Sequence, residues 1–341
     1  MTATPMLPLP LASALLAPYY RLTFHHRVPW PVQRALLNAV ARLQPLPAGT
    51  TVSKAWLGGR PAERVVVGPA PSSEAVLYLH GGGFTTGSPA THRSLAAHLA
   101  REIRRPVYLL DYRLAPEHPC PAALDDTVAA FDALTRVANS VALAGDSAGG
   151  GLALAAAQVL AARGTARPAA LALVSPWANP GVQADRRRDL VVSRAWAFAC
   201  AAAYLGDGDP ADHRYAPALG ALAGLPPTYL HTNVRELLYP QCRTLAAALS
   251  AAGVEVRYVE HARLWHAAQA QAGLVRAAAE SVHDIGRFLT GVWSELQRDA
   301  GPGPGSEPGH VSKPGRGRAE ERPADARTGP ASRETAPEPS S

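Results

Sequence analysis

The chain has 341 residues, of which 47% are hydrophobic, so it is long enough for one large α/β domain with insertions or for two smaller domains. Its formal net charge of +6 is spread along the sequence without a basic stripe of interleaved aromatic residues, which argues against a nucleic-acid partner. The odd number of cysteines, without metal-ligand spacing, predicts reduced thiols in a cytoplasmic protein and no metal site: Cys120, Cys200 and Cys242.

The first 50 residues carry helical periodicity in their apolar positions, from Leu11 to Leu46. Pro29 and Pro31 divide this segment into two expected helices. The apolar start of the chain is interrupted by prolines and is too short to span a bilayer, so we expect no integral membrane segment, while contact with a membrane surface stays open. Helices before the first strand need a surface to cover, and residues 1–50 are therefore expected to form part of a cap.

From residue 64 the pattern changes to short apolar runs that alternate with helical segments. Near-continuous apolar runs are typical of strands that are buried on both faces of a sheet. Strands that alternate with helices predict right-handed βαβ units, and therefore a mostly parallel central sheet flanked by helices. The expected strands cover residues 64–67, 75–79, 106–110, 141–144, 169–174, 228–232 and 254–259, and the expected helices cover 91–101, 121–135, 151–162, 241–252 and 270–296.

The alternation stops between about residues 178 and 217, where an expected helix over 193–205 precedes a polar segment. We expect an insertion into the core (residues 51–297) that completes the cap together with the N-terminal helices. After Arg298 the composition is dominated by Gly, Pro, Ser and mixed charge. Such a segment buries too little apolar surface to offset its ordering entropy, so residues 298–341 are predicted to be disordered.

The sequence Gly145-Asp146-Ser147-Ala148-Gly149-Gly150 lies between an expected strand and an expected helix. Strand, Gly-x-Ser-x-Gly turn and helix together predict a nucleophile elbow, in which the Ser147 hydroxyl stands out of the sheet. Gly145 and Gly149 permit a turn so tight that a side chain at either position would clash with its neighbours. The bare motif also occurs by chance in Gly/Ser-rich loops, so the prediction requires a base, an orienting acid and oxyanion donors elsewhere in the chain.

A glycine triplet, His80-Gly81-Gly82-Gly83, stands at the end of an expected buried strand upstream of the elbow. Backbone N–H groups of glycines can approach a substrate oxygen closely, and losing one such donor typically costs about 3 kcal/mol of transition-state stabilisation. We expect the N–H groups of Gly81, Gly82 and Ala148 to form the oxyanion hole. A phosphate cradle would require Gly-Lys-Ser/Thr, which is absent here. His80 itself is expected to be structural.

The base is expected in the loop after the last strand, where His266 follows Leu264 and Trp265. His261 is a second candidate in the same loop. A lone histidine is usually structural, but His266 falls where this arrangement of strands requires a base.

Five motifs in this order resemble the hormone-sensitive-lipase-like family of α/β-hydrolases, which includes bacterial esterases with a His-Gly-Gly-Gly motif. The resemblance covers roughly residues 65–289. It implies an α/β-hydrolase fold with a helical cap, and a serine hydrolase of the esterase or lipase type that cleaves carboxylic esters of short to medium acyl chain without a cofactor. The motifs are His80-Gly81-Gly82-Gly83, Asp111 to Pro119, Gly145 to Gly150, Ser175-Pro176-Trp177 and Leu225-Pro226-Pro227.

The sequence departs from the family in the turn after the family's seventh strand, which here is the expected strand over 228–232. In this turn Arg235 aligns with the family's aspartate. A cation there would disfavour the imidazolium that forms during catalysis. Glu236 is the nearest carboxylate, and its extra methylene can reach His266 from the adjacent position, so we assign it as the orienting acid. A surface-facing glutamate at the start of a helix is the competing interpretation. The family's glycine shortly before the histidine is also absent, since this loop reads Ala262-Arg263-Leu264-Trp265.

The sequence therefore predicts a cytoplasmic hydrolase of small-molecule esters, with Ser147, His266 and Glu236 as its catalytic residues. A non-catalytic ligand binder on a hydrolase scaffold is the alternative from another class, because the usual aspartate is missing. A lactonase or an amidase would use the same site. A homodimer is left open.

Overall fold

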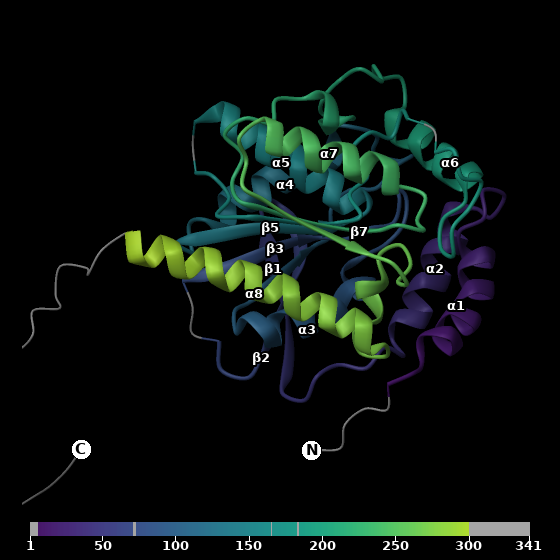
Figure 1. Ribbon diagram of the computed structural model, residues 1–341, viewed down its shortest axis with the longest axis horizontal. Coiled ribbons are helices and arrows are strands. Elements are labelled where there is room, and N and C mark those ends of the chain that lie inside the picture. Colours follow the sequence, from purple (N-terminus) through teal and green to yellow (C-terminus); the bar gives the residue numbers. More distant parts are fainter. Residues whose placement is uncertain (1–5, 71–72, 165, 183, 300–341) are drawn as a thin grey trace, which may run out of the picture. The chain divides into compact units, whose positions relative to one another are not determined.

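The computed structural model describes residues 6–70, 73–164, 166–182 and 184–299. In this part the chain forms an eight-stranded sheet in the order β1-β2-β4-β3-β5-β6-β7-β8 (Figure 1). β2 pairs antiparallel with β1 and β4, and all other neighbours are parallel, so the predicted mostly parallel sheet is confirmed. The strands are β1 (Thr50–Leu57), β2 (Arg60–Val67), β3 (Glu74–Leu79), β4 (Val107–Leu110), β5 (Ser140–Asp146), β6 (Leu171–Val174), β7 (Thr228–Asn233) and β8 (Val256–His261).

Helices cover both faces of the sheet (Figure 1). α3 (Pro89–Ile103) and α8 (Arg276–Asp299) pack together on one face, and α4 (Ala122–Leu134), α5 (Ala148–Arg163) and α7 (Tyr239–Ala251) lie on the other. Two short 3₁₀ turns, Pro217–Leu219 and Ala268–Gln271, complete the regular elements of this core.

The strands at the centre of the sheet are buried on both faces, which explains their unbroken apolar runs. Every residue of β3 is buried. Leu77 and Leu79 belong to the apolar cluster that contains residues of α4, α5 and α7, whereas Val76 and Tyr78 belong to the cluster that contains α3 and α8. This alternation follows from the two-residue period of a strand. The parallel pairing of β3 with β5 places the carboxyl ends of these two strands side by side.

Two elements differ from the expectation. β1 was not predicted, because most of its side chains are exposed and its residues show no apolar alternation. It is one of the two edge strands of the described sheet, and its hydrogen bonds to β2 hold it in place. α8 begins at Arg276 and not near residue 270, because residues 268–271 form a 3₁₀ turn beside the site.

The N-terminal segment forms the two expected helices, α1 (Leu9–Thr23) and α2 (Trp30–Ala41). Both pack near α6 (Arg194–Leu205): the Phe24 ring lies 4.6 Å from that of Trp196, and Trp196 Nε1 donates to Gln33 Oε1 at 2.8 Å. Among the described helices, none has an apolar stretch of the length needed to cross a bilayer. The predicted disordered tail lies almost entirely outside the described residues.

Candidate active site

The turn between β5 and α5 carries Ser147 in an unusual backbone conformation. Ser147 has φ = 52° and ψ = −120°, a left-handed value that costs roughly 1–3 kcal/mol for a residue other than glycine. The flanking glycines permit this turn, since a Cβ on Gly149 would lie 2.0 Å from the Leu79 carbonyl oxygen, and one on Gly145 would lie 2.5 Å from the Gly149 backbone. The predicted nucleophile elbow is therefore present as a strand, a strained turn and a helix.

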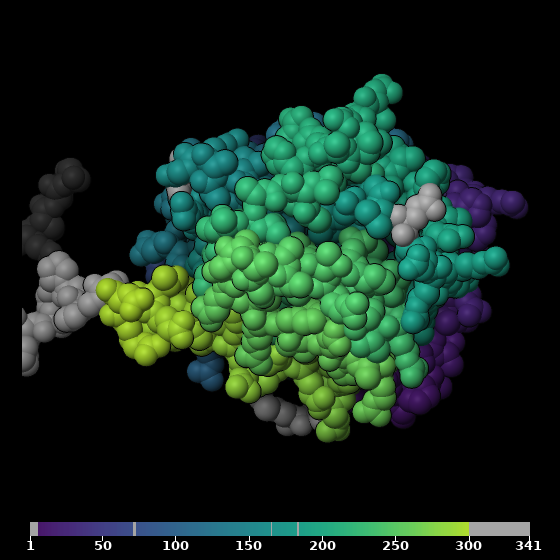
Figure 2. All heavy atoms as spheres, turned by 45° about the horizontal axis from the view of Figure 1, so that its top comes forward, coloured from purple at the N-terminus to yellow at the C-terminus, as the bar shows by residue number. Residues whose placement is uncertain are grey.

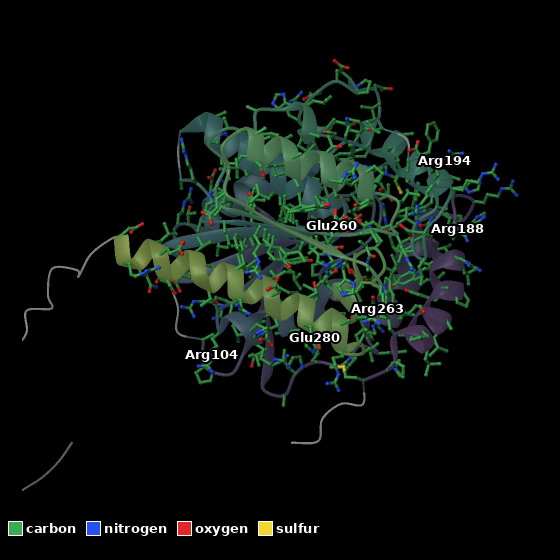
Figure 3. All side chains as sticks on the ribbon, in the orientation of Figure 1. Arg104, Arg188, Arg194, Glu260, Arg263 and Glu280 are labelled. Atoms are coloured by element: carbon green, nitrogen blue, oxygen red, sulfur yellow. The ribbon has the colours of Figure 1, made fainter. Side chains whose placement is uncertain are left out.

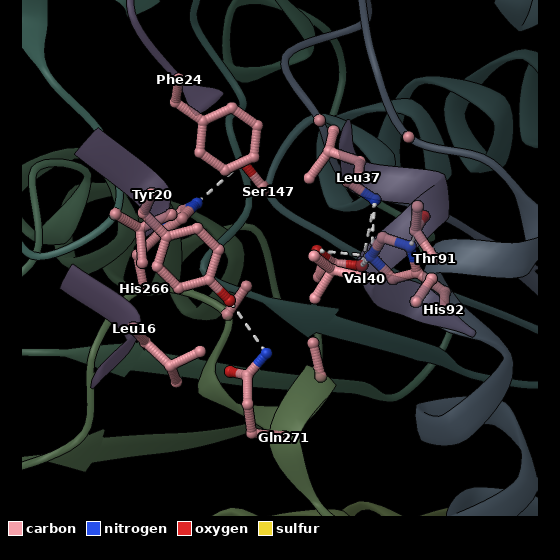
Figure 4. A pocket seen from close by; sticks show the side chains of 18 of the residues that line it. Leu16, Tyr20, Phe24, Leu37, Val40, Thr91, His92, Ser147, His266 and Gln271 are labelled. Carbon is pink, nitrogen blue, oxygen red and sulfur yellow. Dashed lines mark hydrogen bonds and ion pairs between the residues drawn. The ribbon is translucent and has the colours of Figure 1, made fainter. Parts of the chain in front are cut away.

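His266 lies against this serine. Its Nε2 atom is 2.9 Å from Ser147 Oγ, within hydrogen-bond range, as the dashed line in Figure 4 shows. The ring is buried, with 3% of the residue exposed. The competing histidine has another role, because His261 Nδ1 accepts the backbone N–H groups of Arg263 and Leu264 and so shapes the loop that leads to His266.

Glu236 lies on the other side of the His266 ring. Its Oε2 atom is 3.3 Å from His266 Nδ1 and accepts the Ser175 hydroxyl at 2.7 Å, while Oε1 accepts the Thr232 hydroxyl at 2.7 Å. Only 1% of Glu236 is exposed, so the interpretation as a surface-facing glutamate is wrong. Arg235, which aligns with the family's aspartate, is exposed to solvent.

The two ionisable partners shift each other's pKa in the directions that a base and its orienting acid need. Burial raises the pKa of Glu236, but hydrogen bonds from His266, Thr232 and Ser175 outweigh it, so the net shift is downward and the carboxylate stays ionised. Burial lowers the pKa of His266, but the Glu236 carboxylate outweighs it and leaves the pKa above its usual value. The negative charge of Glu236 thus stabilises the imidazolium.

The glycine triplet lies beside the elbow, but its donors differ from those expected. The Gly81 N–H donates to Asp146 Oδ1 at 3.1 Å and also lies 3.3 Å from His92 Nε2. This donor is therefore already engaged, and the assignment of Gly81 to the oxyanion hole is wrong. Within the described residues, no protein acceptor faces the N–H groups of Gly82, Gly83 and Ala148, and all three residues are next to Ser147 or line the same cavity.

Sequence reasoning missed the role of Asp146. This buried residue accepts hydrogen bonds from Tyr78 Oη (2.9 Å) and Gly81 N (3.1 Å) and lies 3.1 Å from His92 Nε2. Burial raises its pKa, but His92 and Tyr78 outweigh it and the net shift is downward. Because Asp146 precedes Ser147 directly, this network ties the glycine loop and α3 to the elbow. Its position inside the Gly-x-Ser-x-Gly motif was the signal available in the sequence.

His80 is structural, in agreement with the expectation. Its ring stacks on Tyr112 with centroids 4.2 Å apart, and its Nδ1 donates to the Gly81 carbonyl at 2.9 Å. Complete burial lowers the pKa of His80 to about 3, so the ring is neutral at physiological pH. The neutral imidazole of His80, fixed by these contacts, stabilises the start of the glycine loop.

An apolar cavity opens onto Ser147 and His266. It measures about 1010 Å³ including its open mouth. Figure 4 shows Tyr20 of α1 and Phe24, which follows α1, on the serine and histidine side of this cavity, and Leu37 and Val40 of α2 on the opposite side, near His92. The other apolar lining residues include Leu16, Leu43, Val191, Val192, Trp196 and Leu274.

One hydrogen-bond chain joins the N-terminal helix to the loop that bears the histidine. Gln271 Nε2 donates to Tyr20 Oη at 2.9 Å (Figure 4). Trp265 Nε1 donates to Gln271 Oε1 at 3.1 Å. Trp265 directly precedes His266. α1 therefore lines the cavity while it is hydrogen-bonded to the segment that carries His266.

Known proteins are similar to this chain in sequence and in fold. A family described as alpha/beta hydrolase fold matches residues 76–270. The esterase LipU of Mycobacterium tuberculosis is 35% identical over 285 residues, which cover 76% of this chain and 93% of LipU. An acetyl-hydrolase of Streptomyces hygroscopicus is 37% identical over 227 residues, covering 62% of this chain and 76% of that protein. The crystal structure of an esterase from the bacterial hormone-sensitive lipase family matches with a TM-score of 0.77 and 33% identity, over 82% of this chain and 97% of that one.

Proposed function

The chain belongs to the hormone-sensitive-lipase-like branch of the α/β-hydrolase family and is an ester hydrolase of the carboxylesterase type, and from this premise we propose that Ser147 cleaves carboxylic esters through an acyl-enzyme. The observation that carries the proposal is the line of contacts from Ser147 Oγ through the His266 ring to Glu236 Oε2, at 2.9 Å and 3.3 Å. A nucleophile, a base and an acid that orients the base are the three groups that serine acyl transfer requires.

In the first step Ser147 Oγ attacks the carbonyl carbon of the ester, and His266 Nε2 accepts the serine proton. Glu236 stabilises the resulting imidazolium through Nδ1–H. The tetrahedral intermediate then collapses: the bond to the leaving alcohol breaks, and His266 donates its proton to that alcohol. Water attacks the acyl-serine with His266 again as base, and the collapse of the second intermediate releases the carboxylic acid and restores the Ser147 hydroxyl.

The oxyanion of both intermediates is proposed to accept hydrogen bonds from the N–H groups of Gly82, Gly83 and Ala148. Their freedom from protein acceptors within the described residues supports this choice. Ala148 is also the first residue of α5, so the positive end of a 16-residue helix faces the developing charge. Donors fixed in a buried site need little reorganisation when the charge appears.

This arrangement removes the reason for interpreting the protein as a non-catalytic ligand binder. That alternative arose because Arg235 stands where the family has an aspartate, yet Glu236 supplies a buried carboxylate beside His266. A lactonase or an amidase shares the same attacking group and oxyanion donors. The lining of the cavity is mostly apolar, which supports esters with apolar acyl chains as substrates.

We propose that α1, α2 and residues 178–217 act as a cap that limits the length of the acyl chain. Both N-terminal helices and the segment around Val192 and Trp196 contribute apolar side chains to the cavity. Turnover of p-nitrophenyl esters is expected to peak for acyl chains of about four to eight carbons, because a cavity of this kind buries a short chain fully and leaves a long one partly in water. A series of esters from acetate to palmitate measures this, and an optimum at the long end would contradict it.

The acyl-enzyme is tested directly by trapping. A fluorophosphonate probe is expected to label the folded protein once, at Ser147, because only an activated serine beside an oxyanion hole attacks the phosphorus. Peptide mass spectrometry locates the label, and denatured protein serves as the control. Ester hydrolysis by a protein that carries no label at Ser147 would place the nucleophile elsewhere.

A further inference from the structure

The N-terminal part of the sequence is unusual in its charges. Residues 1–62 contain no aspartate or glutamate, whereas they contain six cationic side chains: Arg21, Arg27, Arg34, Arg42, Lys54 and Arg60. Two of these have local partners, since Arg34 pairs with Glu117 and Arg60 with Asp126. The cations at the end of α1, Arg21 and Arg27, are exposed and have no ion pair among the described residues.

α1 has two apolar sides, of which only one is buried. Leu16 and Tyr20 face the active-site cavity. Leu11, Leu15 and Leu22 are 47%, 60% and 63% exposed. Steps of four and seven residues put these three leucines on one stripe of the helix, with the exposed Pro18 between them. The stripe is an outward apolar face that nothing in the described residues covers.

A second basic segment lies beside α1. Arg186, Arg187 and Arg188 are exposed, as is Arg194 at the start of α6, and none of them forms an ion pair with a described residue. Leu190 and Val191, between them, pack against the same apolar cluster as Ala12 and Leu16 of α1. Figure 2 shows these teal and purple segments at one edge of the molecule, and Figure 3 labels Arg188 and Arg194 there.

The acidic residues of this segment, Asp185 and Asp189, do not neutralise the positive charge of its arginines. Asp189 points its carboxylate inward, accepting the backbone N–H groups of Val191, Val192 and Leu237. Asp185 is the exposed acid of the segment, against four exposed arginines. We call the exposed leucines of α1 together with Arg21, Arg27, Arg186, Arg187, Arg188 and Arg194 the cap face.

We propose that the cap face docks the protein on the surface of an anionic lipid bilayer. An amphipathic helix that carries leucines on one face and arginines nearby binds such surfaces in the interfacial plane, because the leucines enter the acyl boundary while the arginines meet the lipid phosphates. A second copy of the chain fits this surface poorly, since pairing the stripe with itself brings like charges together. Docking here sets the helix that covers the active-site cavity against the phase into which apolar esters partition.

Vesicle binding tests this proposal separately from catalysis. The full chain carrying Ser147→Ala, which removes hydrolysis from the readout, is mixed with vesicles of phosphatidylcholine alone or with added phosphatidylglycerol, and the bound fraction is measured by flotation. Binding to the anionic vesicles is expected to be at least about tenfold stronger and to weaken as salt is raised. Equal or absent binding to both vesicles overturns the proposal, whatever the esterase activity.

Two sets of substitutions separate the leucines from the arginines. Leu11→Ser/Leu15→Ser/Leu22→Ser and Arg186→Ser/Arg187→Ser/Arg188→Ser are each expected to lower binding about tenfold or more, with turnover of a water-soluble ester and the melting temperature unchanged. The matched control changes Val137, 73% exposed, and Arg104, both outside the cap face (Figure 3 labels Arg104), to serine, and it should bind normally. Unchanged binding by the leucine variant, or a wild-type dimer that this variant dissociates, would overturn the proposal.

Discussion

Replacing Ser147 with alanine is expected to lower kcat for ester hydrolysis by about 10⁵–10⁶-fold, because removing one member of a serine triad costs nearly as much as removing all three. The residual rate comes from substrate binding and from the proposed oxyanion donors, which the substitution leaves in place. The methyl group of alanine is smaller than the side chain it replaces, and the substitution removes the hydrogen bond between Ser147 Oγ and His266 Nε2. Steady-state kinetics with p-nitrophenyl butyrate measure the loss.

Ser140→Ala is the matched control for this substitution. Ser140 is the first residue of the same strand, β5, and lies at its opposite end from Ser147. Its replacement should leave kcat within about twofold of the wild type, as for other partly exposed positions away from a site. A Ser147→Ala protein that keeps a tenth of the wild-type rate, after exclusion of contaminating esterase, would remove this serine from the mechanism.

Replacing Glu236 with glutamine is expected to lower kcat by about 10²–10⁴-fold while the fold is kept. Glutamine has nearly the same shape as glutamate, so its amide group can occupy the place of the carboxylate beside the Ser175 and Thr232 hydroxyls. The amide can turn an N–H toward His266 Nδ1, which stabilises the tautomer that carries its proton on Nε2 and cannot accept one from Ser147. The substitution also removes the negative charge of Glu236, which stabilises the His266 imidazolium.

The pH profile distinguishes this role from a structural one. In the proposed mechanism neutral His266 is the base, so activity is expected to rise as the pH increases through the His266 pKa. Glu236 holds that pKa above its usual value, and its neutralisation removes this influence. The acid limb of the kcat profile should therefore move to lower pH in Glu236→Gln. A merely structural loss would lower the rate at every pH and leave the midpoint unchanged.

Glu280→Gln is the control for the change of charge. Glu280 is exposed on α8, where Figure 3 labels it, and its replacement should change neither the rate nor the midpoint. If Glu236→Gln behaves like this control, the carboxylate that orients His266 must be sought elsewhere; Asp189, whose charge also acts on the His266 pKa, is the next candidate.

The elbow and the central strands could be predicted from the sequence, because residues close to one another in the chain specify each of them. The elbow needs glycines within two positions of Ser147, and the structure shows the backbone contacts that exclude a side chain there. The central strands are apolar throughout because both of their faces are covered. β1 escaped prediction for the opposite reason: its side chains are mostly exposed, and its position depends on pairing with β2.

The sequence by itself determined the family and located Ser147 and His266, the proposed nucleophile and base, since a motif of a few residues and the order of the strands define each of them. The tertiary structure alone decided which carboxylate faces His266, which glycine N–H groups are free and which helices line the cavity. Those choices depend on burial and on distances between segments far apart in the chain: Ser147 and His266 are separated by 119 positions, and Glu236 and His266 by 30. Two adjacent residues, Arg235 and Glu236, look equally placed in the sequence, but the turn after β7 exposes one and buries the other.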